Sequence, residues 1–337
     1  MFGRLISVPI LAFAFMVLSG ASGAQQQEPQ QQKLIDHREE MRLFVQRISR
    51  YARRQKRGFV VITQNGLDLL NKVDEIDTTQ TSPARTYMRS IDGVLATPVY
   101  FGGLDLDVAV ETEETDRVLK LADMAKKNGL KVLVMDYGEK PKTIDTVYRN
   151  ARKKGYASFV ANAYGPDIAD LPRYPKRPAN ENSNSVMSLA KVKNFVYLRD
   201  SQGFGRQDEF AMKMHDTNHD MLIVDVYHGR TPLRPNAVET LKYKKLGSKR
   251  LVLAYVNIGT VASYHYYWQT GWGEGTPPWI SSPTPGDPDT FYAKYWDPGW
   301  QDIITGNPNS FVYGLIRQGF DGIVLDGLET YRFFEGE

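Results

Sequence analysis

The feature that most constrains this chain is the regular alternation of short apolar segments with longer amphipathic ones. Eight apolar segments are rich in β-branched residues, which is typical of strands buried on both faces of a parallel sheet. The segments between them carry apolar residues at helical spacing. The predicted strands are residues 58–64, 91–96, 131–137, 156–161, 195–198, 221–226, 251–257 and 322–326.

Eight strands separated by helices predict an α/β protein with a single (β/α)₈ barrel of the TIM type. A doubly wound open sheet is the alternative. Its usual signature, a glycine-rich phosphate loop after a strand, does not occur, because Gly102-Gly103 lacks the motif spacing. The predicted helices are residues 37–54, 113–128, 144–154, 235–245 and 300–318, the last interrupted at Asn307-Pro308.

The order of these elements is unusual for a barrel. A barrel normally begins with a strand and ends with a helix, whereas this chain begins with the helix 37–54 and ends after the strand 322–326. If the last strand lies next to the first helix in space, the two complete the eighth strand–helix unit, and the chain is circularly permuted. Surface termini that lie close together make such a permutation feasible.

The N-terminal segment has the layout of a secretory signal peptide. Arg4 precedes an apolar run over residues 5–18, and the small residues Ser22 and Ala24 follow it. The run is shorter than the roughly 20 residues that span a bilayer. We therefore expect a secreted or periplasmic protein with no membrane attachment after cleavage. The expected boundaries are 1–24 for the signal peptide, 25–34 for a polar linker and 35–337 for the barrel domain.

Composition excludes several classes of chemistry. The 337 residues contain no cysteine, which rules out a thiolate nucleophile, a disulfide scaffold and a Cys-ligated metal. A formal charge of +3 does not indicate a nucleic-acid partner or an anionic membrane surface. His215 and His219 lie in a turn-forming sequence, so we expect neither a metal site there nor a cofactor. The basic run from Lys242 to Arg250 is typical of a solvated helix end.

Acidic residues stand at the ends of three predicted strands, at Asp136, Asp225 and Asp326. The carboxyl ends of barrel strands meet at one face, where the active sites of barrel enzymes lie. Converging carboxylates suit glycoside hydrolysis, in which one acid protonates the leaving oxygen and another attacks or activates water. A hard cation or simple capping of the next turn is the alternative. Other polar residues at or beside strand ends are Gln64, Asn65, Tyr255 and Asn257.

Aromatic residues are concentrated in one long loop. All five tryptophans lie between Trp268 and Trp300, together with several tyrosines. Flat rings offer stacking surfaces to sugar faces, while tyrosine hydroxyl and indole N–H groups can bond sugar hydroxyls. We expect about half of these rings to form a small core under the loop and the others to contact substrate. The residues predicted to contact sugar are Tyr264, Tyr267, Trp268 and Trp296.

Three segments carry a recognisable pattern: KRLVLAYVNIGTVASYHYYW at 249–268, AKYWDPGWQDII at 293–304 and QGFDGIVLDGLETY at 318–331. They resemble the glycoside hydrolase family 114 barrels, the endo-α-1,4-polygalactosaminidase-like proteins. Segments 52–70, 87–101 and 131–139 also resemble that family, in which they follow the FDGxxLD strand instead of preceding it. The resemblance therefore also predicts a circular permutation.

Carried over residue by residue, the resemblance implies a role for several of the acids. Asp326 corresponds to the aspartate of the FDGxxLD strand, and Glu329 to the acid that follows it. Asp225 and Asp136 correspond to strand-end aspartates of two other family strands.

Two glutamates of the family are absent, and Thr97 and Thr260 stand in their places. Threonine cannot donate a proton as a tuned carboxylic acid does, so another acid is needed for a two-carboxylate mechanism. Displaced replacements could come from the connection after the Thr97 strand, where the acids are Glu111, Glu113 and Glu114.

The sequence thus predicts a secreted, circularly permuted barrel that acts on a polysaccharide containing galactosamine, whose ammonium groups an acidic cleft can pair. One alternative is a catalytically silent carbohydrate-binding barrel. A second is a structural or partner-binding envelope protein that uses the aromatic surface. The predicted catalytic residues are Asp326, Asp225 and Glu329, and those predicted to orient the sugar include Asp136, Gln64, Asn65, Tyr255 and Asn257.

Overall fold

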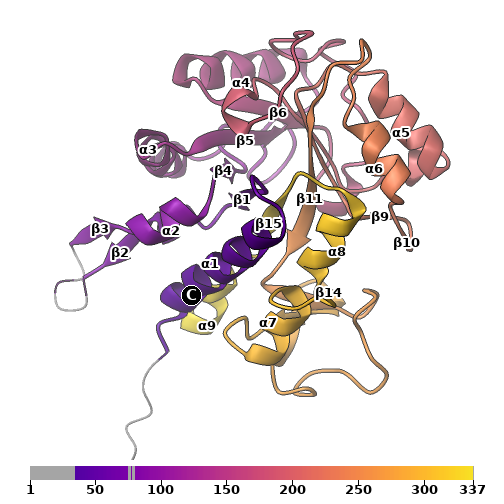
Figure 1. Ribbon diagram of the computed structural model, residues 1–337. Helices are drawn as coiled ribbons and strands as arrows, with labels where there is room; N and C mark the ends of the chain where they lie inside the picture. Colours follow the sequence, from indigo (N-terminus) through magenta and orange to yellow (C-terminus); the bar gives the residue numbers. More distant parts are fainter. Residues whose placement is uncertain (1–34, 75–76, 78–79, 337) are drawn as a thin grey trace, which may run out of the picture. The chain divides into compact units, whose positions relative to one another are not determined.

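Eight parallel strands form the central sheet of the protein (Figure 1). This computed structural model describes residues 35–74, 77 and 80–336, so the predicted signal peptide and linker lie outside the described residues. The order across the sheet is β6-β5-β4-β1-β15-β11-β8-β7. The strands are β1 (Val60–Gln64), β4 (Gly93–Ala96), β5 (Lys131–Tyr137), β6 (Ala157–Ala161), β7 (Val196–Leu198), β8 (Met221–Val224), β11 (Leu251–Asn257) and β15 (Gly322–Asp326).

The sheet curls into a nearly closed barrel of the TIM type, and all eight predicted strands are confirmed. The first and last strands of the barrel are neighbours, with Val60 of β1 in register with Gly322 of β15. At the seam, the described strands β6 and β7 contact each other without a hydrogen-bonded ladder. The rings of Phe159 and Phe195, 5.8 Å apart, pack across this seam.

Helices cover the outside of the barrel (Figure 1). Of these, α2, α5 and α9 were not predicted from the sequence, because each is short and carries little periodic signal. The helices are α1 (His37–Gln55), α2 (Arg85–Ser90), α3 (Thr112–Lys127), α4 (Pro141–Lys154), α5 (Gln207–His215), α6 (Pro235–Leu241), α7 (Pro298–Ile304), α8 (Phe311–Gln318) and α9 (Thr330–Glu335). None of the described helices is long and apolar enough to cross a membrane.

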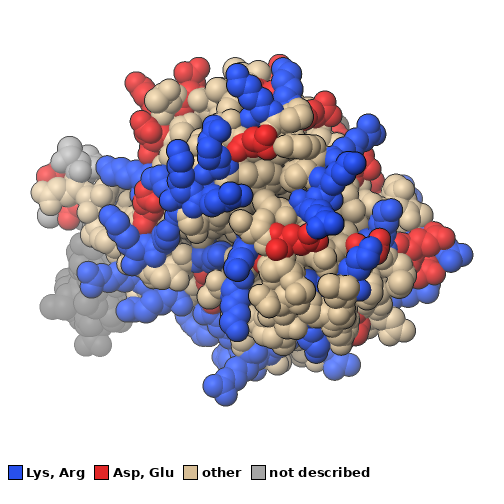
Figure 2. Space-filling model, turned by 90° about the horizontal axis from the view of Figure 1, so that it is seen from above, with Lys and Arg blue, Asp and Glu red and all other residues tan. Residues whose placement is uncertain are grey.

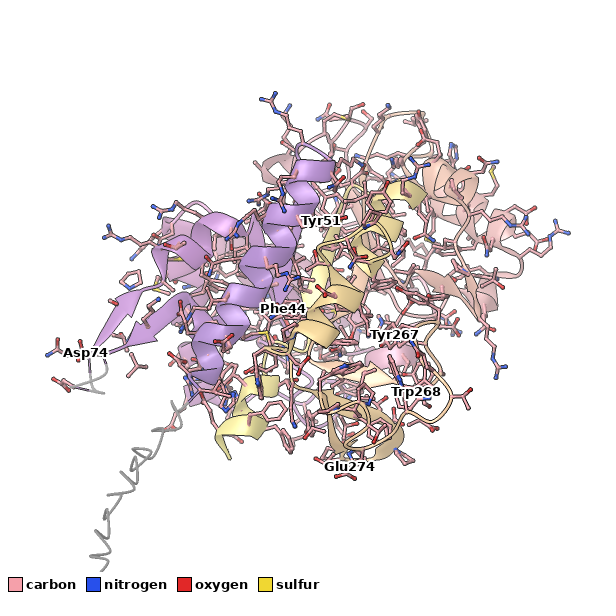
Figure 3. All side chains as sticks on the ribbon, turned by 60° about the horizontal axis from the view of Figure 1, so that its bottom comes forward. Phe44, Tyr51, Asp74, Tyr267, Trp268 and Glu274 are labelled. Atoms are coloured by element: carbon pink, nitrogen blue, oxygen red, sulfur yellow. The ribbon has the colours of Figure 1, made fainter. Side chains whose placement is uncertain are left out.

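Helix α1 precedes β1 in the chain and packs on the outside of the barrel against other helices. Its N-cap is Asp36, whose side chain accepts a hydrogen bond from the Glu39 N–H at 2.8 Å. Phe44 and Tyr51 on its buried face point toward the barrel (Figure 3), and α1 packs against α2, α8 and α9. At its carboxyl end, the Lys56 ammonium donates to the Phe320 carbonyl at 2.7 Å, just before β15.

The short helix α9 follows β15, and Glu335 near its end forms an ion pair with Arg38 of α1 at 2.9 Å. Both ends of the described barrel domain therefore lie side by side at α1 and α9 (Figure 1).

The predicted aromatic loop contains secondary structure of its own. Residues 258–297, here called the aromatic segment, contain a three-stranded antiparallel sheet of β12 (Thr260–Ala262), β14 (Asp287–Ala293) and β13 (Ile280–Thr284). Buried rings, including Trp279 and Tyr295, pack beneath it. The remaining strands form two hairpins, β2 (Asn71–Val73) with β3 (Thr81–Pro83), and β9 (Tyr227–His228) with β10 (Thr231–Pro232).

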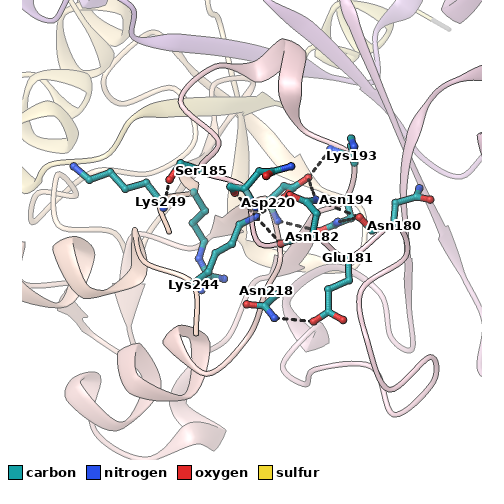
Figure 4. Close-up of polar contacts among 12 residues, drawn as sticks. Asn180, Glu181, Asn182, Ser185, Lys193, Asn194, Asn218, Asp220, Lys244 and Lys249 are labelled. Atoms are coloured by element: carbon teal, nitrogen blue, oxygen red, sulfur yellow. Dashed lines mark hydrogen bonds and ion pairs between the residues drawn. The ribbon is translucent and has the colours of Figure 1, made fainter. Parts of the chain in front are cut away.

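A buried polar cluster holds the long connection between β6 and β7 (Figure 4). The Lys244 ammonium and the Asp220 carboxylate are both fully buried and lie 2.7 Å apart. Lys244 also donates to the Asn182 and Asn184 carbonyls at 3.2 and 2.9 Å, and Asp220 accepts from the Lys193 N–H at 2.8 Å. These bonds tie the connection, which has only short 3₁₀ turns, to the barrel.

We predict that Lys244→Ala lowers the free energy of unfolding by about 3–5 kcal/mol, because it leaves the Asp220 charge buried without its partner. Lys245→Ala is the matched control, since Lys245 pairs with Asp216 at the surface and its removal should leave the stability nearly unchanged. Urea denaturation of both variants measures the difference. Equal stabilities for the two variants would show that the buried pair does not hold the connection.

Candidate active site

The carboxyl end of β15 places Asp326 at the mouth of the barrel. Its register partner on β11 is Asn257, so the two polar side chains leave neighbouring strands at the same level. The Tyr255 hydroxyl donates to Asp326 Oδ2 at 2.7 Å, and the Gly327 N–H donates to Oδ1 at 2.8 Å. Both oxygens are therefore oriented, and each retains lone pairs for a ligand.

Asp326 and Glu329 line the same pocket, which has a volume of about 500 Å³. One wall of the pocket contains Tyr292 of β14 and Phe333 of α9, whose rings stack at 3.9 Å with an angle of 12° between their planes. The stack joins the aromatic segment to the last helix. It gives the pocket a flat apolar surface beside two carboxylates.

The surroundings of Glu329 shift the pKa of its carboxyl group upward from the ordinary value. Withdrawal from bulk water raises the pKa of its carboxyl group, and the negative charge of Asp326 adds to that rise. Arg332, 3.6 Å away, opposes the effect. The side chain remains 45% exposed, so a ligand in the pocket can reach it.

A second pocket of about 240 Å³ adjoins this site through Tyr255, and Asp225 lines it. Arg199, which follows β7 directly, lies 3.6 Å from Asp225 and stands over the Tyr255 ring at 3.3 Å. Thr260 and Tyr264 complete part of the lining. Arg199 therefore links the Asp225 pocket to the tyrosine that holds Asp326.

The remaining polar residues of the mouth bond to one another. The Tyr197 hydroxyl of β7 donates to Gln64 Oε1 of β1 at 3.0 Å, a bond that crosses the barrel because these strands are not neighbours. The Thr97 hydroxyl donates to the Tyr137 hydroxyl at 3.1 Å. Thr97 thus takes part in a side-chain network of the barrel interior and supplies no ionisable group.

Three residues that were predicted to contact sugar form hydrogen bonds to the backbone of nearby loops. Asp136 is fully buried, and its Oδ1 accepts the N–H groups of residues 99–101 at 2.6–2.9 Å. Asn65 Oδ1 accepts from the Thr97 N–H, and Asn257 Oδ1 accepts from the Gly259 and Thr260 N–H groups. For Asp136 this burial leaves no surface for a sugar, which corrects the prediction.

The four predicted aromatic contacts do not lie together. Tyr264, 71% exposed, and Tyr267 line the Asp225 pocket. Trp268 stacks on Phe291 within the aromatic segment, where Figure 3 shows it beside Tyr267. Trp296 contacts His37 of α1 and Phe334 of α9, outside both pockets.

Sequence reasoning missed four residues of the mouth. Arg199 directly follows a predicted strand, so the rule that identified the aspartates could also have found it. Tyr197 looks like an ordinary strand residue. Tyr292 belongs to the predicted aromatic loop but was not among the rings assigned to sugar, and Phe333 lies on a helix with no periodic signal. The proposed displaced acids are also separated: Glu114 lines a hollow of about 510 Å³ next to Glu329, whereas Glu111 and Glu113 do not line it.

Within the described part of the chain, no group of three or more His, Asp or Glu side chains is arranged to hold a metal ion. The carboxylates of the mouth instead pair with arginine or accept hydrogen bonds from tyrosine and backbone groups.

No family model matches the chain. It is 31% identical to an uncharacterized protein of Deinococcus radiodurans over 119 residues, which cover 35% of this chain and 36% of that protein. It is 35% identical to one of Thermotoga maritima over 85 residues, 25% of each chain. A match to one of Methanocaldococcus jannaschii is 25% identical over 173 residues, 51% of this chain and 48% of that one. The chain thus spans less than half the length of these relatives.

Among solved structures, a crystal structure of a chitinase from Bacteroides thetaiotaomicron resembles the chain with a TM-score of 0.38 and 11% sequence identity. The match covers 81% of this chain and 90% of that one. A likeness at this level bears on neither activity nor substrate.

The buried carboxyl group of Asp136 should make the stability of the protein depend on pH. Burial raises its pKa from 3.8 to about 6, although three N–H donors offset part of the rise. Between these pH values the folded protein retains a proton that the unfolded chain has released, so the contribution of Asp136 to stability falls as the pH rises. We expect wild type to gain roughly 2–3 kcal/mol relative to Asp136→Asn when the pH is lowered from 7 to 4, measured by urea denaturation.

The exposed Asp116→Asn variant is the control for this experiment, since Asp116 lies on the surface of α3. A stability difference between wild type and Asp136→Asn that is the same at both pH values would contradict the assigned shift.

Proposed function

We propose that this protein is a carbohydrate-active enzyme that hydrolyses a glycosidic bond at the mouth of its barrel. The observation that carries the proposal is the placement of Asp326 and Glu329 on the lining of one pocket, beside the Tyr292–Phe333 stack. Two carboxyl groups next to a flat apolar surface suit a sugar chain better than they suit a small polar metabolite. The Trp-rich partner-binding alternative has less support, since Trp279 and Trp300 are buried.

In this proposal the two carboxyl groups have different tasks. Protonated Glu329 donates its proton to the glycosidic oxygen as the bond from that oxygen to the anomeric carbon breaks. The Asp326 carboxylate either attacks the anomeric carbon, forming a glycosyl ester that a water molecule then hydrolyses, or takes a proton from a water molecule that attacks the anomeric carbon directly. The raised pKa of Glu329 supports the acid role, because it keeps the proton available at higher pH.

Tyr255 and Arg199 act as positioning residues. Tyr255 holds Asp326 Oδ2 at 2.7 Å, and Arg199 packs on the face of the same tyrosine. Glu329 and Asp225 each lie 3.6 Å from an arginine, so the acid role of Glu329 rests on its raised pKa and on its place beside Asp326 in one pocket. We assign Asp225, with Tyr264 and Tyr267, to binding of a sugar unit next to the reacting one.

The substrate class we propose is a polysaccharide with amino sugars, as the resemblance to the polygalactosaminidase-like barrels implies. Asp326 and Glu329 line one pocket and Asp225 lines the other. A carboxylate can form a charge-assisted hydrogen bond with a protonated amine. We also propose that residues 1–24 direct export and that the barrel is a circular permutation. The packing of α1 against α9, which follows β15, and the bond from Lys56 to the Phe320 carbonyl just before β15 support the second proposal.

The proposal predicts that the purified protein releases new reducing ends from de-N-acetylated poly-galactosamine. Asp326→Asn should lower the rate by at least about 100-fold, because the variant has neither the nucleophile nor the base. Asp116→Asn on the surface of α3 is the matched control and should keep the wild-type rate.

Tight binding of the polymer with no cleavage by wild type would contradict hydrolysis and favour a silent carbohydrate-binding barrel. The replacement of two family glutamates by Thr97 and Thr260 is the observation behind that alternative. If wild type neither binds nor cleaves the polymer, the result contradicts both the proposed hydrolysis and the carbohydrate-binding alternative.

A further inference from the structure

The barrel has a second large hollow at the opposite end, where its strands begin. Here called the basal hollow, it has a volume of about 800 Å³ and is built from connections that lead into the strands. Residues 56–58 precede β1, residues 88–92 precede β4 and residues 128–130 precede β5. Residues 186–190, from the connection between β6 and β7, also line it. Leu189 packs closely on β4, where a Cβ on Gly93 would lie 3.2 Å from its Cδ2 atom.

The rim of the basal hollow carries an excess of positive charge. Its lining includes six Lys or Arg residues against three Asp or Glu residues. Arg57, Arg89 and Lys249 are exposed and form no ion pair with any described residue, whereas Lys56 and Lys242 share Asp321. Figure 2 looks onto this end of the molecule and shows blue side chains gathered around a tan surface.

The fold explains why cations gather at this end. Helices that run antiparallel to the strands end here, and basic residues occupy the last turns of α1, α3 and α4, where they interact favourably with the helix dipole. These residues are Arg53, Arg54, Lys126, Lys127, Arg152, Lys153 and Lys154. Acidic first turns of α1 and α3 lie at the other end. The small net charge of the chain therefore conceals a strongly basic face.

We propose that the basal hollow binds a linear acidic polysaccharide, whose carboxylates pair with the cations of the rim. Its size exceeds that of a single small anion, and its cations come from separate connections, as a polymer with repeated charges requires. Met187, the exposed large apolar residue of the described lining, can pack against the apolar face of one sugar ring.

Two other polyanions fit the basal hollow less well. No aromatic residue lines it, so single-stranded nucleic acid would lack the stacking surfaces such proteins use. A membrane surface would need protruding apolar residues, but Met88, Ile91 and Leu189 are buried, and Met187 is the exposed large apolar residue among the described lining residues. The same absence of aromatic rings means that a neutral polysaccharide would bind weakly, because charge pairing must supply the affinity.

Fluorescence anisotropy with a labelled oligogalacturonate tests the proposal on the whole protein. We expect binding at about 20 mM NaCl and at least about tenfold weaker binding at about 300 mM, because salt screens the charge pairs. The triple variant Arg57→Gln, Arg89→Gln, Lys249→Gln should bind at least about tenfold more weakly than wild type at low salt. Cleavage is not a readout, so a failure of the proposed hydrolysis leaves this test intact.

The matched control removes three exposed cations from the mouth end, by Lys142→Gln, Arg230→Gln and Arg234→Gln, and should keep wild-type affinity. Equal binding by the two triple variants would overturn the proposal. So would equal binding of an uncharged maltooligosaccharide of the same length. Binding of duplex DNA or of phosphatidylserine vesicles in place of oligogalacturonate would also overturn it, since the surface would then serve another class of partner.

Discussion

Every hydrogen-bonded strand of the barrel runs parallel to its neighbours, so the helices that connect the strands, such as α1, α3 and α4, run in the opposite direction. The strands therefore end at one end of the molecule and these helices end at the other, and different kinds of side chain gather at the two ends. Strand ends deliver Asp326, Asp225 and Arg199 to the mouth. The ends of these helices deliver lysine and arginine to the opposite end of the molecule, where the basal hollow lies. A single geometric rule thus separates a site with reactive carboxylates from a basic face, although the chain as a whole is nearly neutral.

At the mouth, the hydrogen bond from Tyr255 to Asp326 joins the two pockets into one site. The tyrosine ring lies under Arg199, its hydroxyl group orients Asp326, and its side chain lines the Asp225 pocket. A change at any of these groups therefore reaches the others through direct contact. The aromatic segment completes the site from outside the barrel, since Tyr292 of β14 stacks on Phe333 of α9.

Local sequence patterns were sufficient for the barrel but not for the site. The eight strands were predictable because each is a compact apolar run, buried in the structure as its pattern indicates. Asp136 was misjudged because position at a strand end does not reveal that the side chain captures the N–H groups of residues 99–101. Trp296 contacts α1, and Phe333 completes the pocket, through long-range packing that no local pattern encodes. The basic face was missed because its cations are distant in the sequence.

The central claim is that Glu329 supplies the proton while Asp326 acts on the anomeric carbon, and the pH–rate profile of Glu329→Gln tests it most directly. For wild type we predict that kcat falls as the pH rises through the raised pKa of Glu329, because the acid form is lost. For the variant we predict a rate at least about 100-fold lower, without that descending limb. A variant with the wild-type rate and the wild-type profile would contradict the account.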